Sequence, residues 1–540
     1  MSEITIREEF GQEELSVAEV WSETEIEARV KVPYPVAFTD KIMACVMFVL
    51  AYLAVDTFSF SLSPQWYGVG VTVFILFYGI AILAYARHLG QKIGKEGVFW
   101  FAIMELSGLS YALIYNSTLM VFHGVFLRTV LLYFTAAVFG SLMTGRTSGY
   151  VLFDGINALL MIPCQNLKAM GTVIGENFSR YKAAGTLFRA LLGLVAAIPL
   201  FGVIVSLLAS ADREFAHIIT RLFEIGWEKF FDQIWVLFLA IPVSCYLFGL
   251  AYGAAHQRKT ENFKKDKIDH LLAVCGVIPR ASIYAVLIGI CLLYLLFIGV
   301  QGKYYLSALQ GILPSGFTYS EYARSGFFEL VTVSIINLCL IGATELLVKK
   351  QEKKDKKDVL LRCSNVILSV LTLFLIATAM TKMALYIKVY GLTPLRVVPS
   401  VFMVFLAIVF LLIVICQFRT VPVARIGVFA FAVSYVVLSL ANMDGRIARY
   451  NLARYQAGTL DEIPQWTLVD GSLASVPAIY DFWMTTTNQN DKEELERIAA
   501  RITDWDDGAI YSSQHSWKYT NRAKGLAVKE LNEMLQNEIR

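Results

Sequence analysis

Two charged residues stand inside long apolar runs of this 540-residue chain, where a charge is costly to bury. Glu105 lies within the run 97–115, and Arg128 lies within the run 118–143. At about 1.5 Å per residue, both lie roughly 13 Å from the same boundary of a hydrocarbon layer about 30 Å thick. Adjacent antiparallel helices would bring them together, so we expect an intramembrane ion pair. A role in transport or proton relay is the alternative.

A second set of charged and polar residues borders apolar runs in the second half of the chain. Its members are Glu321, Arg324, Glu329, Lys382, Lys388, Arg396, Asp444 and Asn451. Lys and Tyr at the end of an apolar run are ordinary anchors at a membrane interface. Both signs of charge are nevertheless expected at one membrane face. We therefore expect either a polar pocket that binds an anionic group or the internal joint of a C-terminal domain.

Signatures of the common catalytic and metal sites are missing from the sequence. There is no His-Glu-x-x-His and no Gly-x-Ser-x-Gly. The stretch Gly90-Gln-Lys-Ile-Gly94-Lys95 is one residue short of a phosphate-binding loop, and Glu96 replaces the Ser or Thr that would bind magnesium. The six histidines show no metal-ligand spacing. We expect no catalytic residue, no metal and no cofactor, and an enzyme is not favoured.

The composition identifies the elements that must position these residues. Hydrophobic residues make up 56% of the chain and charged residues only 17%, with a net charge of +3. This balance excludes a disordered protein and a nucleic-acid-binding protein. Apolar runs near 20 residues long predict an all-α polytopic membrane protein with about eleven transmembrane helices. The runs are 41–60, 66–86, 97–115, 118–143, 184–209, 231–254, 281–300, 326–347, 360–381, 398–417 and 424–441.

The connections between these runs alternate in basic charge. One set of five connections holds 22 Lys and Arg residues, and the alternate set holds 8. The basic set is expected in the cytoplasm. Three parts of the chain follow: an acidic cytoplasmic tail at 1–40, a transmembrane bundle at 41–441 and an extracytoplasmic C-terminal domain at 442–540. The N-terminus is then cytoplasmic and the C-terminus extracytoplasmic.

Two local patterns refine this expectation. Leu495, Ile498 and Ile502 recur at helical spacing in the C-terminal segment, which predicts a small helical domain docked on the outer face. Gly249-x-x-x-Gly253 in the sixth run is a close-packing pattern for neighbouring helices.

Several stretches resemble an uncharacterised bacterial membrane family, domain-of-unknown-function family 4173, which is close to family 4153. The resemblance covers roughly residues 150–540. It implies a multi-pass protein of the bacterial plasma membrane and brings no established activity. The stretches are Leu-Leu-Ala-Ser-Ala-Asp-Arg-Glu-Phe at 207–215, Tyr-Ser-Glu-Tyr-Ala-Arg-Ser-Gly-Phe-Phe-Glu-Leu at 319–330, and those at 382–396, 442–455 and 516–521.

Three functions stay open from the sequence. The favoured one is a non-catalytic regulator, sensor or scaffold whose outer domain meets an envelope protein. The alternatives are a small-solute or ion transporter and an envelope enzyme that acts on lipid-linked glycans. The expected partners are the lipid bilayer, an envelope protein and anionic lipid, the last at the lysine-rich run 349–357. No nucleic-acid partner is expected.

Overall fold

The computed structural model describes residues 36–57, 67–115, 118–179, 200–212, 214–215, 227–263, 265–274, 278–309, 319–347 and 359–536, with single positions at 193 and 197. The chain is nearly all helical, with 84% helix and no strand in the described residues. The predicted all-α polytopic class is therefore confirmed. Most of the predicted acidic tail, residues 1–35, lies outside the described residues.

Nine helices in the described residues are long and apolar enough to cross a membrane, and each overlaps a predicted run. These helices are α2 (Phe38–Thr57), α3 (Val69–His88), α5 (Met120–Val138), α11 (Trp227–Ala255), α13 (Arg280–Leu309), α14 (Tyr319–Leu347), α15 (Val359–Tyr390), α16 (Pro394–Phe418) and α17 (Val423–Leu440).

The two remaining predicted runs are not among these nine helices. The run 97–115 forms α4 (Lys95–Leu113), but this helix does not reach the apolar character of the other nine. It carries Glu105 and lies between α3 and α5. The run 184–209 falls mainly outside the described residues, and its end forms a shorter apolar helix, Leu200–Ala211.

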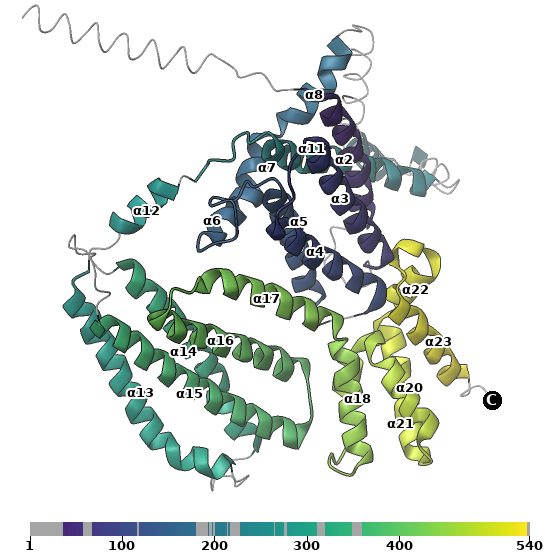
Figure 1. Cartoon of the computed structure of the whole chain (residues 1–540). Coiled ribbons are helices and arrows are strands. Elements are labelled where there is room, and N and C mark those ends of the chain that lie inside the picture. Colours follow the sequence, from purple (N-terminus) through teal and green to yellow (C-terminus); the bar gives the residue numbers. More distant parts are fainter. Residues whose placement is uncertain are drawn as a thin grey trace, which may run out of the picture.

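Helices α2, α3, α4, α5 and α11, here called the first bundle, pack around one core (Figure 1). Fully buried side chains of this core include Ile82, Leu127, Phe134 and Phe248. Buried residues make up 39% to 61% of the most apolar stretches of α2, α3, α5 and α11. Helix α17 packs against α4 on one side and α16 on the other.

Short helices between α5 and α11 complete the first bundle. They are α6 (Val151–Ile156), the π-helix η2 (Asn157–Met161), α7 (Ile162–Gln165) and α8 (Lys168–Ser179). A Cβ added to Gly253 would lie 2.5 Å from Asn166 Nδ2, and one added to Gly249 would lie 2.9 Å from the Pro163 carbonyl oxygen. The Gly249-x-x-x-Gly253 pattern is thus a close-packing site, and its partner is the short helix α7.

Helices α13, α14, α15 and α16 form the second bundle, which has a separate core that includes Leu287, Phe327, Leu368 and Phe410. Buried residues make up only 11% to 39% of its most apolar stretches. Leu292 and Leu296 on α13, for example, are 60% and 66% exposed. An apolar outer surface of this kind suits contact with lipid.

The residues after α17 form a cluster of helices, here called the C-terminal cap. They are α18 (Met443–Gln456), α19 (Gln465–Asp470), η3 (Ser472–Ala474), α20 (Val476–Thr485), α21 (Gln489–Trp505), α22 (Asp507–His515), η4 (Trp517–Tyr519) and α23 (Arg522–Gln536). Leu495, Ile498 and Ile502 are buried as their spacing predicts. The cap shares one continuous hydrophobic core with the first bundle.

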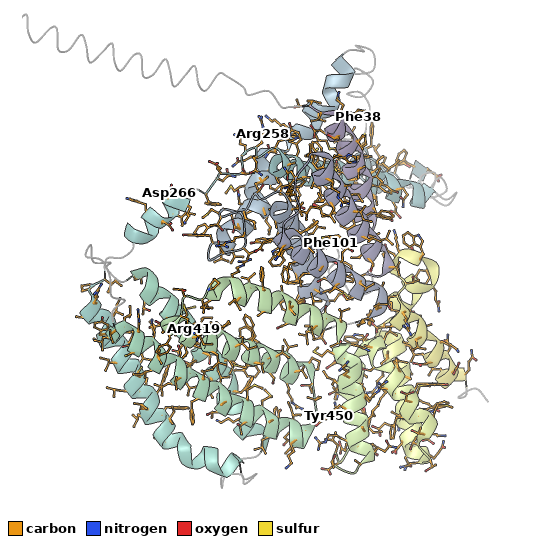
Figure 2. All side chains as sticks on the ribbon, in the orientation of Figure 1. Phe38, Phe101, Arg258, Asp266, Arg419 and Tyr450 are labelled. Carbon is orange, nitrogen blue, oxygen red and sulfur yellow. The ribbon has the colours of Figure 1, made fainter. Side chains whose placement is uncertain are left out.

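The cap and the basic connections occupy opposite ends of the helices. Figure 2 shows Arg258, after α11, and Arg419, after α16, away from the cap helix that carries Tyr450. At the basic end, Arg425 at the start of α17 pairs with Glu96 at the start of α4. The alternation that the sequence predicts is therefore geometrically consistent, and which end faces the cytoplasm stays a prediction.

Candidate functional site

The turn between α15 and α16 meets α18 in a joint built around Asn451. The Asn451 side chain is fully buried; its Oδ1 accepts from the Leu392 amide at 2.7 Å and its Nδ2 donates to the Leu392 carbonyl at 2.8 Å. Gly391 has a positive φ of 75°, and a Cβ there would lie 2.5 Å from Asn451 Oδ1. The joint therefore requires glycine at this position.

Two arginines complete the joint at the C-terminal end of α15. Arg396 Nη1 donates to the Tyr390 carbonyl at 2.9 Å and to the Gly391 carbonyl at 2.5 Å, and its guanidinium lies 4.1 Å from the centre of the Tyr386 ring. Arg454 Nη1 donates to the Ile387 carbonyl at 3.0 Å. Arg396 thus binds carbonyls that the helix end leaves unpaired, whereas Arg454 shares the Ile387 carbonyl with the Gly391 amide, which donates to it at 2.9 Å.

Asp444, one of the predicted ligand-binding residues, ties α18 to the segment before α5. Its carboxylate accepts from the Thr118 hydroxyl at 2.9 Å and from the Thr118 amide at 3.3 Å. The Asp444 side chain is only 2% exposed. This carboxylate therefore serves an internal contact.

The other predicted residues lie along α14 and α15. Glu329 Oε2 accepts from the Gly326 amide at 3.0 Å, and Lys382, 7% exposed, interacts electrostatically with Glu329. Lys388 is exposed. The side chains of Glu321 and Arg324 lie outside the described ones. The contacts of Arg396, Asp444 and Asn451 are of the kind expected for an internal joint of the C-terminal domain, which is one of the two alternatives. A ligand-binding role for the predicted residues stays a prediction.

Sequence reasoning missed the residues that seat the cap on the first bundle. Lys518 Nζ lies 2.6 Å from Asp56 Oδ1 at the end of α2. Lys524 is fully buried, and its Nζ donates to the carbonyls of Tyr67 and Tyr519, each at 3.1 Å. Two signals in the sequence touch this contact: Asp56 is an acid near the end of an apolar run, and Lys518 lies in the family-like stretch 516–521.

Burial shifts the pKa values of two charged groups in this seat, Lys524 and Asp506. Burial lowers the pKa of the Lys524 ammonium to about 8, and the nearby Asp506 carboxylate opposes that shift. Burial also raises the pKa of Asp506, although the carboxylate accepts hydrogen bonds from Ser472 and from the Leu473 amide. Tyr115, before α5, donates to Asp506 Oδ1 at 3.4 Å. The seat thus holds two opposite charges that burial disfavours, and their mutual attraction offsets only part of that cost.

Glu105 and Arg128, the predicted intramembrane pair, lie on α4 and α5. Glu105 Oε1 faces α3, where a Cβ added to Gly79 would come within 2.5 Å of it, and it has no hydrogen-bond partner in the described residues. Arg128 Nη1 lies 3.0 Å from where a Cβ on Gly124 would be. The Glu105–Arg128 ion pair stays a prediction.

A buried polar cluster lies near these residues, between α4, α5 and α17. His123 Nε2 contacts Ser110 Oγ at 2.7 Å and the Ser107 carbonyl at 3.0 Å. His123 Nδ1, Ser107 Oγ and Tyr111 OH are buried without a hydrogen-bond partner in the described residues. Ser110, Tyr111 and His123 border a cavity of about 10 Å³, close to the volume that one water occupies.

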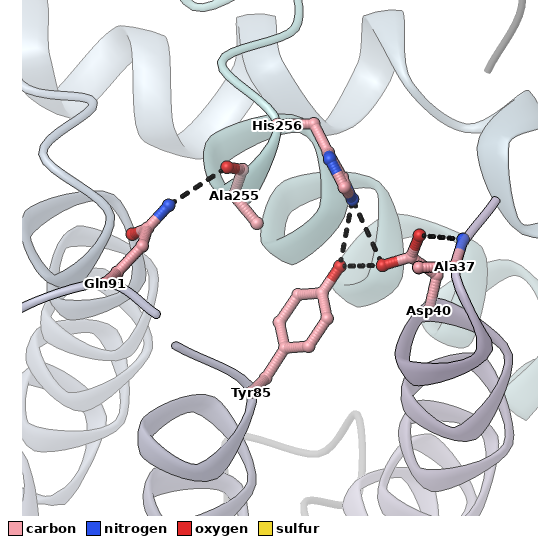
Figure 3. A network of polar contacts seen from close by, with 6 residues as sticks. All are labelled: Ala37, Asp40, Tyr85, Gln91, Ala255 and His256. Atoms are coloured by element: carbon pink, nitrogen blue, oxygen red, sulfur yellow. Dashed lines mark hydrogen bonds and ion pairs between the residues drawn. The ribbon is translucent and has the colours of Figure 1, made fainter. Parts of the chain in front are cut away.

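A second polar network closes the opposite end of the first bundle (Figure 3). Asp40 Oδ1 accepts from Tyr85 OH at 2.6 Å and contacts His256 Nε2 at 3.1 Å, and Asp40 Oδ2 accepts from the Ala37 amide at 2.8 Å. Asp40 is fully buried. Its three partners come from separate segments, so the network fastens the ends of α2, α3 and α11.

The comparisons with known proteins place the chain in one family. A family model described as "Domain of unknown function (DUF4153)" matches residues 103–482. The matched stretch begins within α4 and ends within α20, so it includes part of the first bundle, the whole second bundle and the joint, but not α2 and α3. No curated protein and no solved structure matches the chain. The resemblance to family 4173 stays a prediction.

Proposed function

The chain belongs to the DUF4153 family, and we propose that it is a non-catalytic membrane scaffold or regulator whose C-terminal cap presents a fixed surface to an envelope protein. One observation supports this proposal: the cap shares a continuous core with the first bundle. A cap held in this way presents its outer helices in one orientation. Such preorganisation favours binding, because little freedom is lost when a partner docks.

The proposal includes a location and an orientation. The protein lies in a bacterial plasma membrane, with the tail 1–40 and the N-terminus in the cytoplasm and the domain 442–540 outside. Anionic lipid is a further partner at the run 349–357, which lies outside the described residues. Replacement of the exposed Lys529 by Cys, followed by a membrane-impermeant maleimide on intact cells, tests the orientation. Labelling only after the cells are opened would overturn it.

The scaffold proposal is tested by gentle purification of the full chain from its own membrane, followed by mass spectrometry of the bound molecules. We expect a stoichiometric protein partner. The variant Lys524→Ala, which removes the buried cation of the seat, should lose that partner, whereas Lys529→Ala on the exposed face of α23 should keep it. A chain that never retains a protein would contradict the proposal.

A transporter is the second candidate function, and the cluster around His123 favours it. Glu105, Ser107, Tyr111 and His123 all carry buried polar atoms without a hydrogen-bond partner in the described residues. Unsatisfied polar groups inside a membrane bundle are typical of ion and proton pathways. Proton flux into vesicles that contain the purified chain, lost in Glu105→Gln and His123→Ala, would support transport and displace the scaffold proposal.

An envelope enzyme is not proposed. The acid nearest the first predicted outer connection is Asp56, and it is engaged by Lys518 at 2.6 Å. Among the residues that the structure describes, no group of three or more His, Cys, Asp or Glu side chains converges as a metal site would require.

A further inference from the structure

An open groove with a volume of about 740 Å³ runs across the C-terminal cap between the chain that follows α18 and helix α21. Tyr455, Asp461, Glu462, Gln465, Trp466 and Glu494 are among its lining residues. We propose that this acidic groove binds a lysine- or arginine-rich segment of a protein partner. The inference deepens the scaffold proposal and rests on it, because it states the chemistry of the partner that the cap meets.

The charge of the groove selects a cationic occupant. Three carboxylates line it, from Asp461, Glu462 and Glu494, and no lysine or arginine does. Asp461 and Glu462 are exposed, and in the part of the chain that the structure describes no salt bridge is formed by any of the three. A groove lined by one sign of charge concentrates ligands of the opposite sign.

The polar contacts at the rim leave this charge in place. Glu494 Oε1 accepts from Gln465 Nε2 at 2.7 Å, so the neutral amide orients the carboxylate without cancelling it. Asp491 adds a fourth acid beside the groove, where it accepts from Tyr455 OH at 3.0 Å. Arg501 and Arg454 lie beside the groove but outside its lining: Arg501 Nη1 donates to Gln465 Oε1 at 3.4 Å, and Arg454 Nη2 donates to the Thr459 carbonyl at 2.8 Å.

Trp466 adds a second element of recognition. Its side chain is 75% exposed, although it follows the groove-lining residues Pro464 and Gln465 directly. The face of an indole ring attracts a lysine or arginine side chain and is the strongest aromatic partner for a cation. An exposed indole beside uncompensated carboxylates is therefore suited to a basic side chain.

The spread of the acids favours an extended chain over a single ion. Asp461 and Glu462 precede α19, whereas Glu494 lies on α21. Within the described residues, no three acidic, histidine or cysteine side chains are close enough to hold a metal. Several cations along one peptide would match these separated carboxylates.

Fluorescence anisotropy tests the inference on the full chain in nanodiscs of zwitterionic lipid. The probe is a fluorescein-labelled nine-residue peptide of alternating Lys and Gly, and an acidic peptide of the same length is the negative control. We expect saturable binding that weakens as the salt concentration rises from 20 to 150 mM. The double variant Asp461→Asn/Glu462→Gln should weaken binding at least tenfold.

Two matched controls separate the groove from bulk charge. Asp504→Asn/Asp507→Asn removes two acids outside the groove-lining residues and should leave binding within twofold of wild type. Trp466→Ala should weaken binding about fivefold, whereas Trp505→Ala, which removes another exposed indole (74%), should not. The inference would be overturned if both double variants weakened peptide binding equally. It would also be overturned if free choline competed for the groove as tightly as the labelled peptide binds.

The failure of this inference differs from the failure of the scaffold proposal. A partner that copurifies with wild type and also with Asp461→Asn/Glu462→Gln would sink the groove inference and leave the scaffold standing. If no partner copurifies with wild type, the scaffold proposal fails whatever the peptide does.

Discussion

The two bundles are built from similar apolar residues, but their interiors differ. The first bundle buries tyrosines, a histidine and several carboxylates among its helices, and the cap closes one of its ends. The second bundle keeps a smaller core and leaves much of α13 exposed. Among the described residues, the side-chain hydrogen bonds between its helices centre on Asn337, which donates to Thr372 Oγ1 at 2.9 Å and accepts from Tyr294 OH at 2.8 Å.

This difference indicates that protein contacts fix the helix positions in the first bundle, whereas lipid surrounds more of the second bundle. Buried polar contacts and close approaches at glycine specify helix neighbours in a membrane, where the hydrophobic effect between helices is absent. The first bundle has such contacts at both ends and at Gly249 and Gly253. The second bundle relies on apolar packing, so lipid forms a larger share of its surroundings.

The largest expected effect comes from the seat of the cap. Lys524→Ala removes a fully buried cation and leaves Asp506 without its nearby charge. The carbonyls of Tyr67 and Tyr519 also lose their buried donor, which costs about 1 to 3 kcal/mol each, so the melting temperature should fall and the cap should become sensitive to protease. Lys529→Ala, whose side chain is 74% exposed, is the control. Equal melting temperatures for both variants would mean that the cap is not seated through Lys524.

One substitution made in each bundle tests the comparison directly. Leu127→Ala deletes a fully buried side chain of the first bundle and should lower the free energy of unfolding by about 3 kcal/mol. Leu296→Ala, at a site 66% exposed on α13, should change it by less than about 0.5 kcal/mol. Thermal unfolding in detergent measures both. A large effect at Leu296 would reveal a protein surface packed where we assign lipid.

The joint between the second bundle and the cap should respond next. Asn451→Ala leaves the amide and carbonyl of Leu392 without their buried partner, which costs about 2 kcal/mol. Hydrogen exchange should rise at residues 387–396, while exchange in α2 and α3 stays unchanged. Faster exchange throughout the first bundle would show that the two regions unfold together.

The smallest effect is a pH dependence of stability that only the first bundle and its cap should show. The folded pKa of Lys524 is about 8 and the unfolded value is higher, so between these values the unfolded chain binds more protons. The stability that Lys524 contributes must then increase as the pH rises from 8 to 9, by about 1 kcal/mol. The difference in melting temperature between wild type and Lys524→Met should shift in that direction. A constant difference would contradict the lowered pKa.

The sequence predicted the fold more completely than the site, for a physical reason. A span is a local property, because about 20 apolar residues must form a helix in lipid wherever they pack. Nine runs were therefore placed correctly. The run 97–115 was predicted as a span in the same way, and it forms α4, which is less apolar than the nine because Glu105 interrupts it.

The contacts of the site are not local, and single-residue types did not reveal them. Asn451 stood out as a candidate ligand, but its partner Leu392 is 59 positions away and is engaged through its backbone. Lys524 is a charged residue in an otherwise ordinary amphipathic helix, and nothing in its spacing indicates complete burial. Trp466 and the neighbouring acids carried no recognised motif, because the groove exists only once α19 and α21 pack together.

The contact between Lys518 and Asp56 joins residues that are 462 positions apart. A ribosome completes α2 and α3 long before it makes α23, so in the interval between them the ends of these helices that face the cap lack their cover. Only a chain that extends past residue 524 supplies both Lys518 and Lys524 to them. A nascent chain that stops before residue 518 would expose Asp56 and the carbonyl of Tyr67, so docking of the cap marks the point in translation at which these two groups become covered.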